Sequence, residues 1–150
     1  MREIRRTKAR VERERVPASE DPAFHLKLGP GALSDVEWTV QLLQMQHAGR
    51  IPELRTTRTL ETLEVAVRHE LVGEQDARAL AAAWLFASRA RNATVQVRGR
   101  PSDQLPRDVR ERSAVARVLR YEPGESDTMV NDYLRAARQA RAVVDRVFWS

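Results

Sequence analysis

The sequence contains no cysteine among its 150 residues. A chain without thiols forms no disulfide, no cysteine-ligated zinc site and no thiol nucleophile, so these classes are excluded. Its apolar runs are also short, and none approaches the roughly 18 residues that a membrane-spanning helix needs. The first residues are too charged for a secretory leader. We therefore expect a cytoplasmic protein that does not contact a membrane.

Aromatic residues are scarce, at 5% of the sequence. The core must therefore be built from Leu, Val and Ala, a composition that favours helices over a sheet. Hydrophobic residues make up 42% and charged residues 31%, which is typical of a globular chain rather than a disordered one. This length is sufficient for one domain with a real core.

Apolar residues recur at i, i+3, i+4 and i+7 along most of the chain, the pattern of helices with one buried face. We predict an all-α bundle of five to six helices over residues 2–15, 33–48, 59–73, 74–97, 107–121 and 126–148. Ser34 or Asp35 should lie near the cap of the second of these, and Ser126 and Asp127 should cap the last. Met45 should widen the buried arc of the second helix, and Val109, Ala116 and Leu119 should point inward.

Two parts are expected within the chain. Residues 1–16 form a charged connecting helix whose only buried stripe is Ile4 and Val11, too thin to be stable alone. A polar linker over residues 17–22 follows. Residues 17–150 then make up the helical bundle domain.

Basic residues outnumber acidic ones, giving a net charge of +5, and nearly all of them are arginine. Residues 2–15 alone carry a net charge of +4. Such a surface fits nucleic acid, a phosphate-bearing ligand or an acidic protein face. Arginine richness is equally typical of a GC-rich genome. His25, His47 and His69 lack metal-ligand spacing, so we predict no metal site.

The stretch from Phe24 to Trp38 carries the most distinctive pattern. A short apolar segment leads into a glycine turn, which we define as residues 27–32, and a helix follows. A lysine, two glycines and two carboxylates are the candidate nucleotide-site residues: Lys27, Gly29, Gly31, Asp35 and Glu37. A mobile lysine beside a helix N-terminus suits a phosphate. The same residues also fit a well-capped helix.

This stretch resembles the Lys-x-Gly-x-Gly-Gly-[Leu/Ile]-x-Asp-[Ile/Val]-Glu-[Phe/Trp] motif of the glutamine synthetase adenylyltransferase family. The matching residues are Lys27, Gly29, Gly31, Leu33, Asp35, Val36, Glu37 and Trp38. Ala32 departs, because the family usually has a second glycine there and alanine disfavours a left-handed backbone. The resemblance extends over nearly the whole chain. Residues 34–38, 98–100 and 147–149 are similar to the C-terminal, adenylylating unit of actinobacterial-type members.

The resemblance implies a function that the chain carries only in part. Family members transfer AMP from ATP to a tyrosine of glutamine synthetase and also remove it, with Mg²⁺ held by an Asp-x-Asp pair. No Asp-x-Asp occurs in this sequence. We therefore predict no catalytic residue here, an inactive fragment, and no tightly bound cofactor. The implied partners are a preceding nucleotidyltransferase domain, glutamine synthetase, a PII-type signal protein and glutamine.

A second group of basic residues lies near the end of the fourth predicted helix and in the loop that follows. These secondary anion-site candidates are Arg89, Arg91, Arg98 and Arg100, the last two flanking a glycine. The loop ends in Leu105-Pro106, as in the family.

The alternative function is a stand-alone basic helical module that binds nucleic acid or an acidic protein. A nucleic-acid reader gathers its arginines on one exposed helix face. In this chain they are scattered over every predicted helix, so nucleic acid is the less favoured partner.

Overall fold

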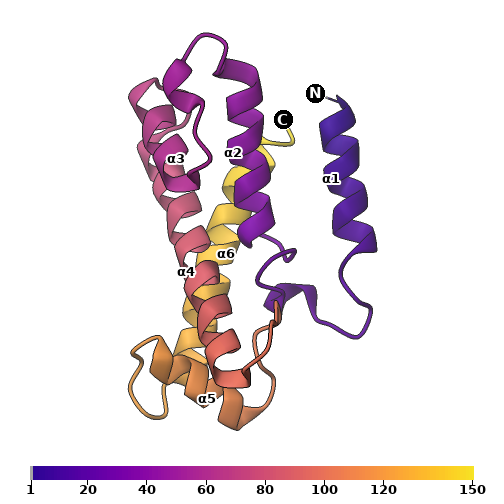
Figure 1. Cartoon of the computed structure of the whole chain (residues 1–150), viewed down its shortest axis with the longest axis vertical. Coiled ribbons are helices and arrows are strands. Elements are labelled where there is room, and N and C mark those ends of the chain that lie inside the picture. The colour runs from indigo at the N-terminus through magenta and orange to yellow at the C-terminus, as the bar shows by residue number, and fades with distance from the viewer. Residues whose placement is uncertain (1) are drawn as a thin grey trace.

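The computed structural model describes residues 2–150 and contains α-helices joined by loops and short 3-10 turns (Figure 1). The α-helices are α1 (Arg2–Glu14), α2 (Leu33–His47), α3 (Thr59–Arg68), α4 (Glu74–Arg98), α5 (Val109–Val118) and α6 (Ser126–Val147). The 3-10 turns are Pro22–Phe24 and Pro52–Leu54. Residues 2–150 form no strand beyond an isolated antiparallel bridge between His25 and Gln104. The all-α prediction is confirmed.

The long helices α4 and α6 lie side by side along the longest axis of the molecule (Figure 1). Helices α2 and α3 flank them over one half, and α5 lies at the opposite end. Two groups of buried residues follow this division. The first, mainly from α2, α3, α4 and the end of α6, includes Val36, Leu43, Leu63, Leu80 and Phe148. The second, mainly from α4, α5 and the first half of α6, includes Leu26, Leu105, Val115, Met129 and Tyr133.

Small residues let α4 pack closely against its neighbours. Most of its buried positions are alanine, and the others are Leu80 and Thr94; the alanines are Ala77, Ala83, Ala87, Ala90 and Ala93. Since the distance between packed helices depends on the side chains at their contact, this series places α4 close to α6. The helix ends at Arg98 because Gly99 adopts a left-handed backbone, with φ of 67°, and donates its N–H to the Val95 carbonyl.

The predicted helix ends are close to the observed ones, but the predicted cap of α6 is wrong. Ser126 is the first helical residue, and the residue before it, Glu125, makes no side-chain cap. Helix α2 begins after Ala32, again without a side-chain cap, so Asp35 falls in the first helical turn. Helix α3 ends at Arg68 rather than near residue 73, and Glu70 beyond it has a positive φ of 55°.

Two residues predicted to be buried are exposed. Val109 is 73% exposed and Met45 is 54% exposed. The buried residues of α5 are Val115 and Ala116, both in its second half. Val109 shares a helical face with Ala116, but it lies two turns earlier, where α5 no longer covers the core.

Helix α1 lies alongside α2 on the outer side of the bundle (Figure 1). Ile4 packs against the first core group, as the sequence predicts. The most buried side chain of the helix is nevertheless Lys8, which is 1% exposed. Lys8 lies between Ile4 and Val11 on the same helical face, so an ammonium group occupies the centre of the stripe that contacts the bundle.

Candidate functional site

The glycine turn is held by close backbone packing. Gly31 has a left-handed backbone, with φ of 72°, and a Cβ added there would overlap the carbonyl of Ala137 on α6. A Cβ added to Gly29 would overlap the carbonyls of Pro22 and His25. Ala32 has an extended backbone, with φ of −81° and ψ of −169°, so the alanine that departs from the family motif is not strained. Both motif glycines are therefore required by packing.

The segment that enters the turn pairs with the loop after α4. The Leu26 N–H donates to the Asp103 carbonyl at 2.7 Å, and the Leu105 N–H donates to the Phe24 carbonyl at 2.9 Å. His25 is buried, and its Nδ1 accepts the Leu28 N–H at 2.9 Å. These bonds fix the backbone on both sides of Lys27.

Asp35 anchors the other end of the turn. Its Oδ2 accepts the Gly31 N–H at 2.7 Å and lies 3.1 Å from Nη1 of Arg141 on α6. Its Oδ1 lies 2.5 Å from Nζ of Lys8 on α1. The carboxylate is 3% exposed. It therefore joins α1, the glycine turn, α2 and α6 at one buried point.

Further charged and aromatic groups surround Lys8. Glu12, one turn along α1, forms a second ion pair with it and also lies 3.3 Å from Arg141. The ammonium lies 5.4 Å from the ring centre of Phe148 and 5.2 Å from that of Trp149, within cation–π range. Arg141 also pairs with Asp145 at 2.9 Å. We call this set the Asp35 network: Lys8, Glu12, Asp35, Arg141 and Asp145.

The network keeps Asp35 ionised. Burial acts to raise the pKa of the Asp35 carboxyl. The attraction and hydrogen bond of Lys8, the Gly31 N–H and the charge of Arg141 together outweigh it and hold that pKa below its ordinary value. Burial likewise acts to lower the pKa of the Arg141 guanidinium, but Asp35 and Asp145 raise it. Both groups are therefore charged over the physiological range.

The structure separates Lys27 from the carboxylates. Lys27 is exposed, whereas Asp35 is paired with Lys8 and Arg141. Glu37 lies two residues after Asp35, so it points to a different side of α2. Its carboxylate accepts the indole N–H of Trp84 on α4 at 3.3 Å, and it lines a polar pocket of about 260 Å³ with Gln41, Gln44 and four threonines.

A groove of about 500 Å³ lies against the glycine turn. Pro30 of the turn and Ala23 form one side, and α6 forms the other with Ala137, Arg138 and Arg141 among its lining residues. Arg138 is exposed. Asp145 also lines the groove, and Arg141 is already paired with Asp35, Glu12 and Asp145, so Arg138 is the basic side chain that this largely apolar groove presents to an anionic ligand.

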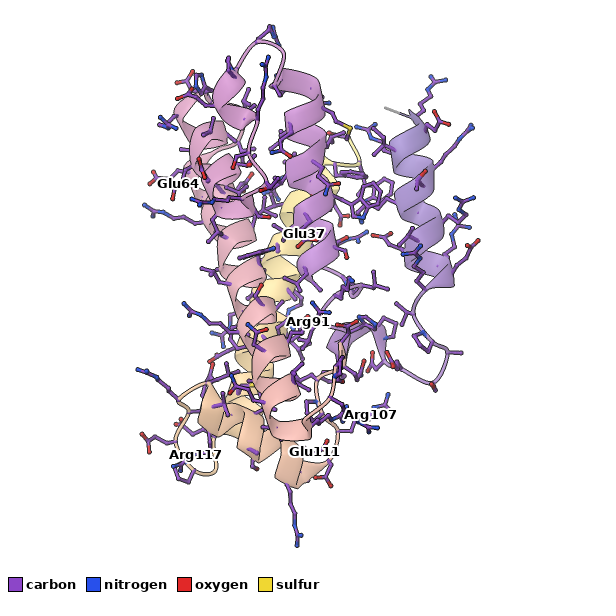
Figure 2. All side chains as sticks on the ribbon, in the orientation of Figure 1. Glu37, Glu64, Arg91, Arg107, Glu111 and Arg117 are labelled. Atoms are coloured by element: carbon purple, nitrogen blue, oxygen red, sulfur yellow. The ribbon has the colours of Figure 1, made fainter. Side chains whose placement is uncertain are left out.

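The secondary arginine candidates lie in different settings. Arg91 pairs with Asp103 at 2.5 Å, which places it beside the backbone pairing with residue 26. Arg98 makes two bonds to Glu111 and one to Ser102, so these partners occupy its guanidinium. Arg89 lines a pocket of about 320 Å³ with Phe86 and Tyr121, and Arg100 is exposed in the loop. The structure therefore links Arg91 to the glycine turn but does not gather the four arginines into one anion site. In Figure 2, Glu37 lies well away from Arg107, Glu111 and Arg117 around the α5 end, and Arg91 lies between them.

Sequence reasoning missed Lys8 and Arg141. The available signal was weak: Lys8 is one of only two lysines in the chain and lies between Ile4 and Val11 on one face of α1. Arg141 lies one turn after Ala137, at the edge of the buried stripe of α6, and is partly exposed. A charge placed on an otherwise apolar stripe indicates a buried partner, but it does not identify that partner.

Within residues 2–150, no group of three or more His, Cys, Asp or Glu side chains is arranged to hold a metal ion. None of the helices described for this part of the chain is both long and apolar enough to cross a membrane.

Comparison with known proteins gives consistent matches. The protein family described as GlnD PII-uridylyltransferase matches residues 2–149. Similar relatives are named bifunctional glutamine synthetase adenylyltransferase/adenylyl-removing enzyme. The relative from Streptomyces avermitilis is 54% identical over 99% of this chain, that from Nocardia farcinica 52% over 100%, and that from Streptomyces coelicolor 51% over 100%. In each case the chain spans 15% of the relative's length.

Proposed function

The chain belongs to the family described as GlnD PII-uridylyltransferase, and we propose that it is the helical domain that follows the adenylylating nucleotidyltransferase domain in a bifunctional glutamine synthetase adenylyltransferase. The relatives with that name match it at about 50% identity over nearly its full length. The whole enzyme would transfer AMP from ATP to a tyrosine of glutamine synthetase, and would remove it again, to control nitrogen assimilation. It would act in the cytoplasm.

The geometry of the glycine turn is the observation that best supports this function. The turn is fixed by packing against α6, by backbone pairing with residues 103–105 and by Asp35, yet Lys27 at its start is exposed. A rigid turn that presents one mobile ammonium group suits contact with a phosphate bound on an adjoining surface. Within this domain, Lys27 would neutralise charge that develops on the transferred phosphoryl group.

Residues 2–150 do not fit a Mg²⁺ site. Hard cations need several oxygen ligands, and the described residues bring no three acidic or histidine side chains together for that purpose. The Mg²⁺ ligands would belong to the preceding nucleotidyltransferase domain. This chain would contribute Lys27 and, in the groove beside Pro30, the exposed guanidinium of Arg138.

Regulatory partners belong to the same proposal. Glutamine synthetase would be the protein substrate, and glutamine and a PII-type signal protein would report nitrogen status to the enzyme. The domain would border the nucleotide site and relay such signals to it. Calorimetry of the chain with ATP·Mg²⁺, glutamine and a PII-type protein in turn would show which of these it binds directly.

The central test is Lys27→Ala in a hybrid enzyme, in which this chain replaces the matching segment of the Streptomyces avermitilis relative. We expect AMP transfer to glutamine synthetase to fall by roughly a hundredfold, the order associated with one electrostatic stabiliser. Because Lys27 is exposed, its replacement should leave the melting temperature of the 150-residue chain nearly unchanged. The chain alone should show no AMP transfer.

Arg107→Ala provides the matched control, because Arg107 is also exposed but lies at the α5 end (Figure 2). This variant should retain full activity in the hybrid. If Lys27→Ala loses activity only in proportion to the folded fraction, or loses no more than Arg107→Ala, the role assigned to Lys27 is wrong.

A further inference from the structure

We propose that Lys8 is a positioning residue: by docking α1 onto Asp35, it sets the backbone of the glycine turn that presents Lys27. The inference rests on the proposed function, because it assigns to α1 the task of holding that turn in its working geometry. It also makes the position of the turn depend on whether α1 is docked.

The chain of contacts from α1 to the turn is short and buried. Nζ of Lys8 meets Oδ1 of Asp35 at 2.5 Å, and Oδ2 of the same carboxylate accepts the Gly31 N–H at 2.7 Å. Lys8 is 1% exposed and Asp35 is 3% exposed. Only one side chain therefore separates the ammonium of α1 from the backbone of the turn.

The charge of Lys8 contributes more to the position of α1 than to the stability of the fold. A buried ion pair contributes little or nothing compared with well-packed apolar residues, because both charges lose their hydration. A leucine or methionine at position 8 would extend the stripe of Ile4 and Val11. An ammonium instead requires its acceptors at defined distances, and Asp35 and Glu12 provide them. The pair therefore selects one docked position of α1 over neighbouring ones.

Asp35 retains one cation without Lys8. Arg141 pairs with Oδ2, the oxygen that also accepts the Gly31 N–H. Loss of Lys8 leaves Oδ1 without its partner from α1, so the carboxylate can rotate toward Arg141 and change its bond to Gly31. We expect the domain to remain folded while the turn, and Lys27 with it, takes up several positions.

The first test uses the small number of lysines. Lys8 and Lys27 are the only two in the chain, one buried and one exposed. Acetic anhydride in limiting amounts, followed by peptide mass spectrometry, should modify Lys27 at least tenfold faster than Lys8. In Asp35→Asn, Lys8 should lose most of this protection while Lys27 reacts as before. Equal reactivity of the two lysines in the unmodified chain would contradict docking of α1 through Lys8.

The second test measures catalysis in the hybrid enzyme. Lys8→Met keeps the length of the side chain and removes its charge, and we expect kcat for AMP transfer to fall by about tenfold, as misplacement of a distant group can cause. KM for ATP should change less than twofold. Lys8→Arg, which retains a charge, should recover part of the loss. Arg10→Met alters the exposed face of α1 and should have no effect.

The outcomes separate the two proposals. If Lys8→Met is fully active while Lys27→Ala is impaired, the positioning role of Lys8 is wrong and the role of Lys27 stands. If Lys8→Met and Lys8→Arg both lose activity only with the folded fraction, Lys8 is purely structural. If Lys27→Ala itself has no effect, the proposed function of the turn fails independently of Lys8.

For the isolated chain, NMR should show the Gly31 amide signal shifted or broadened in Lys8→Met and unchanged in Arg10→Met.

Discussion

At the scale of single residues, Gly31 carries two separate constraints. Its left-handed backbone disfavours any side chain, and its Cα faces the carbonyl of Ala137 so closely that a Cβ has no room. Gly99 shares only the first constraint: its φ is 67°, but no atom lies within 4 Å of an added Cβ. A comparison of substitutions at Gly31 and Gly99 therefore separates the effect of backbone strain from that of steric overlap.

We expect Gly31→Ala to destabilise the chain much more than Gly99→Ala. The strain of a left-handed alanine should cost roughly 1–2 kcal/mol in both variants. Only Gly31→Ala must also displace α6 or the turn, so its total cost should exceed that of Gly99→Ala by about 2 kcal/mol or more. Urea unfolding followed by helical circular dichroism measures both. Equal losses would mean that the contact with Ala137 is not tight.

At the scale of secondary-structure elements, the apolar pattern correctly predicts that α5 is a helix but assigns it the wrong buried residues. Val109 and Ala116 are seven residues apart and share a side, yet only the second is buried. Val115, which the periodic pattern did not single out, is fully buried. Periodicity gives the direction in which a residue points, but the extent of the neighbouring helices decides whether anything covers it.

Truncation of Val115 should therefore destabilise the fold, whereas truncation of Val109 should have little effect. Val115→Ala removes two buried methyl groups and should lower the free energy of unfolding by about 2 kcal/mol. Val109→Ala should change it by less than about 0.5 kcal/mol, since surface substitutions rarely do more. Thermal melts of the two variants beside the parent chain provide the comparison. A large loss in Val109→Ala would place its side chain in the core after all.

At the scale of the whole molecule, the Asp35 network links stability to pH. The folded chain holds the pKa of Asp35 below its ordinary value of 3.8, so the unfolded chain takes up a proton first as the solution is acidified. The contribution of this carboxylate is complete above about pH 4 to 5 and is lost as the pH falls through the lowered pKa.

We therefore expect the free energy of unfolding to decrease from pH 5 to pH 3, and to decrease less steeply in Asp35→Asn, which cannot ionise. At pH 7 this variant should already be less stable by about 3 kcal/mol, because it removes the buried carboxylate that Lys8 and Arg141 share. Urea titrations at pH 7, 5, 4 and 3 give the two curves. Parallel curves would show that Asp35 does not contribute to the acid dependence.

Much of this fold could be predicted from the sequence, because most of its helices have a periodic apolar face and turn residues such as Gly49 and Gly99 follow α2 and α4. Val36, Val40 and Leu43 define the buried side of α2 without any knowledge of its neighbours. Lys8 could not be placed in this way. Its acceptor Asp35 lies 27 residues along the chain, and Arg141, which shares that acceptor, lies a further 106 residues on. Only the tertiary structure brings these three charges together.

The candidate site was predictable in its residues but not in their arrangement. The motif drew attention to Lys27, Gly31 and Asp35 together, and their spacing fitted either a nucleotide site or a well-capped helix. In the structure Asp35 instead forms an ion pair with Lys8, and Lys27 is exposed. Two residues on one turn can point apart, so proximity in sequence did not fix the pairing.

The contact between Gly31 and α6 also limits how this chain can evolve. The atom opposite Gly31 is the main-chain oxygen of Ala137, and every amino acid carries that oxygen. No replacement at position 137 can therefore make room for a larger residue at position 31. Compensation would require α6 to follow a different path, and several substitutions would have to arise together. A change of residue at position 31 therefore requires a change in the path of α6.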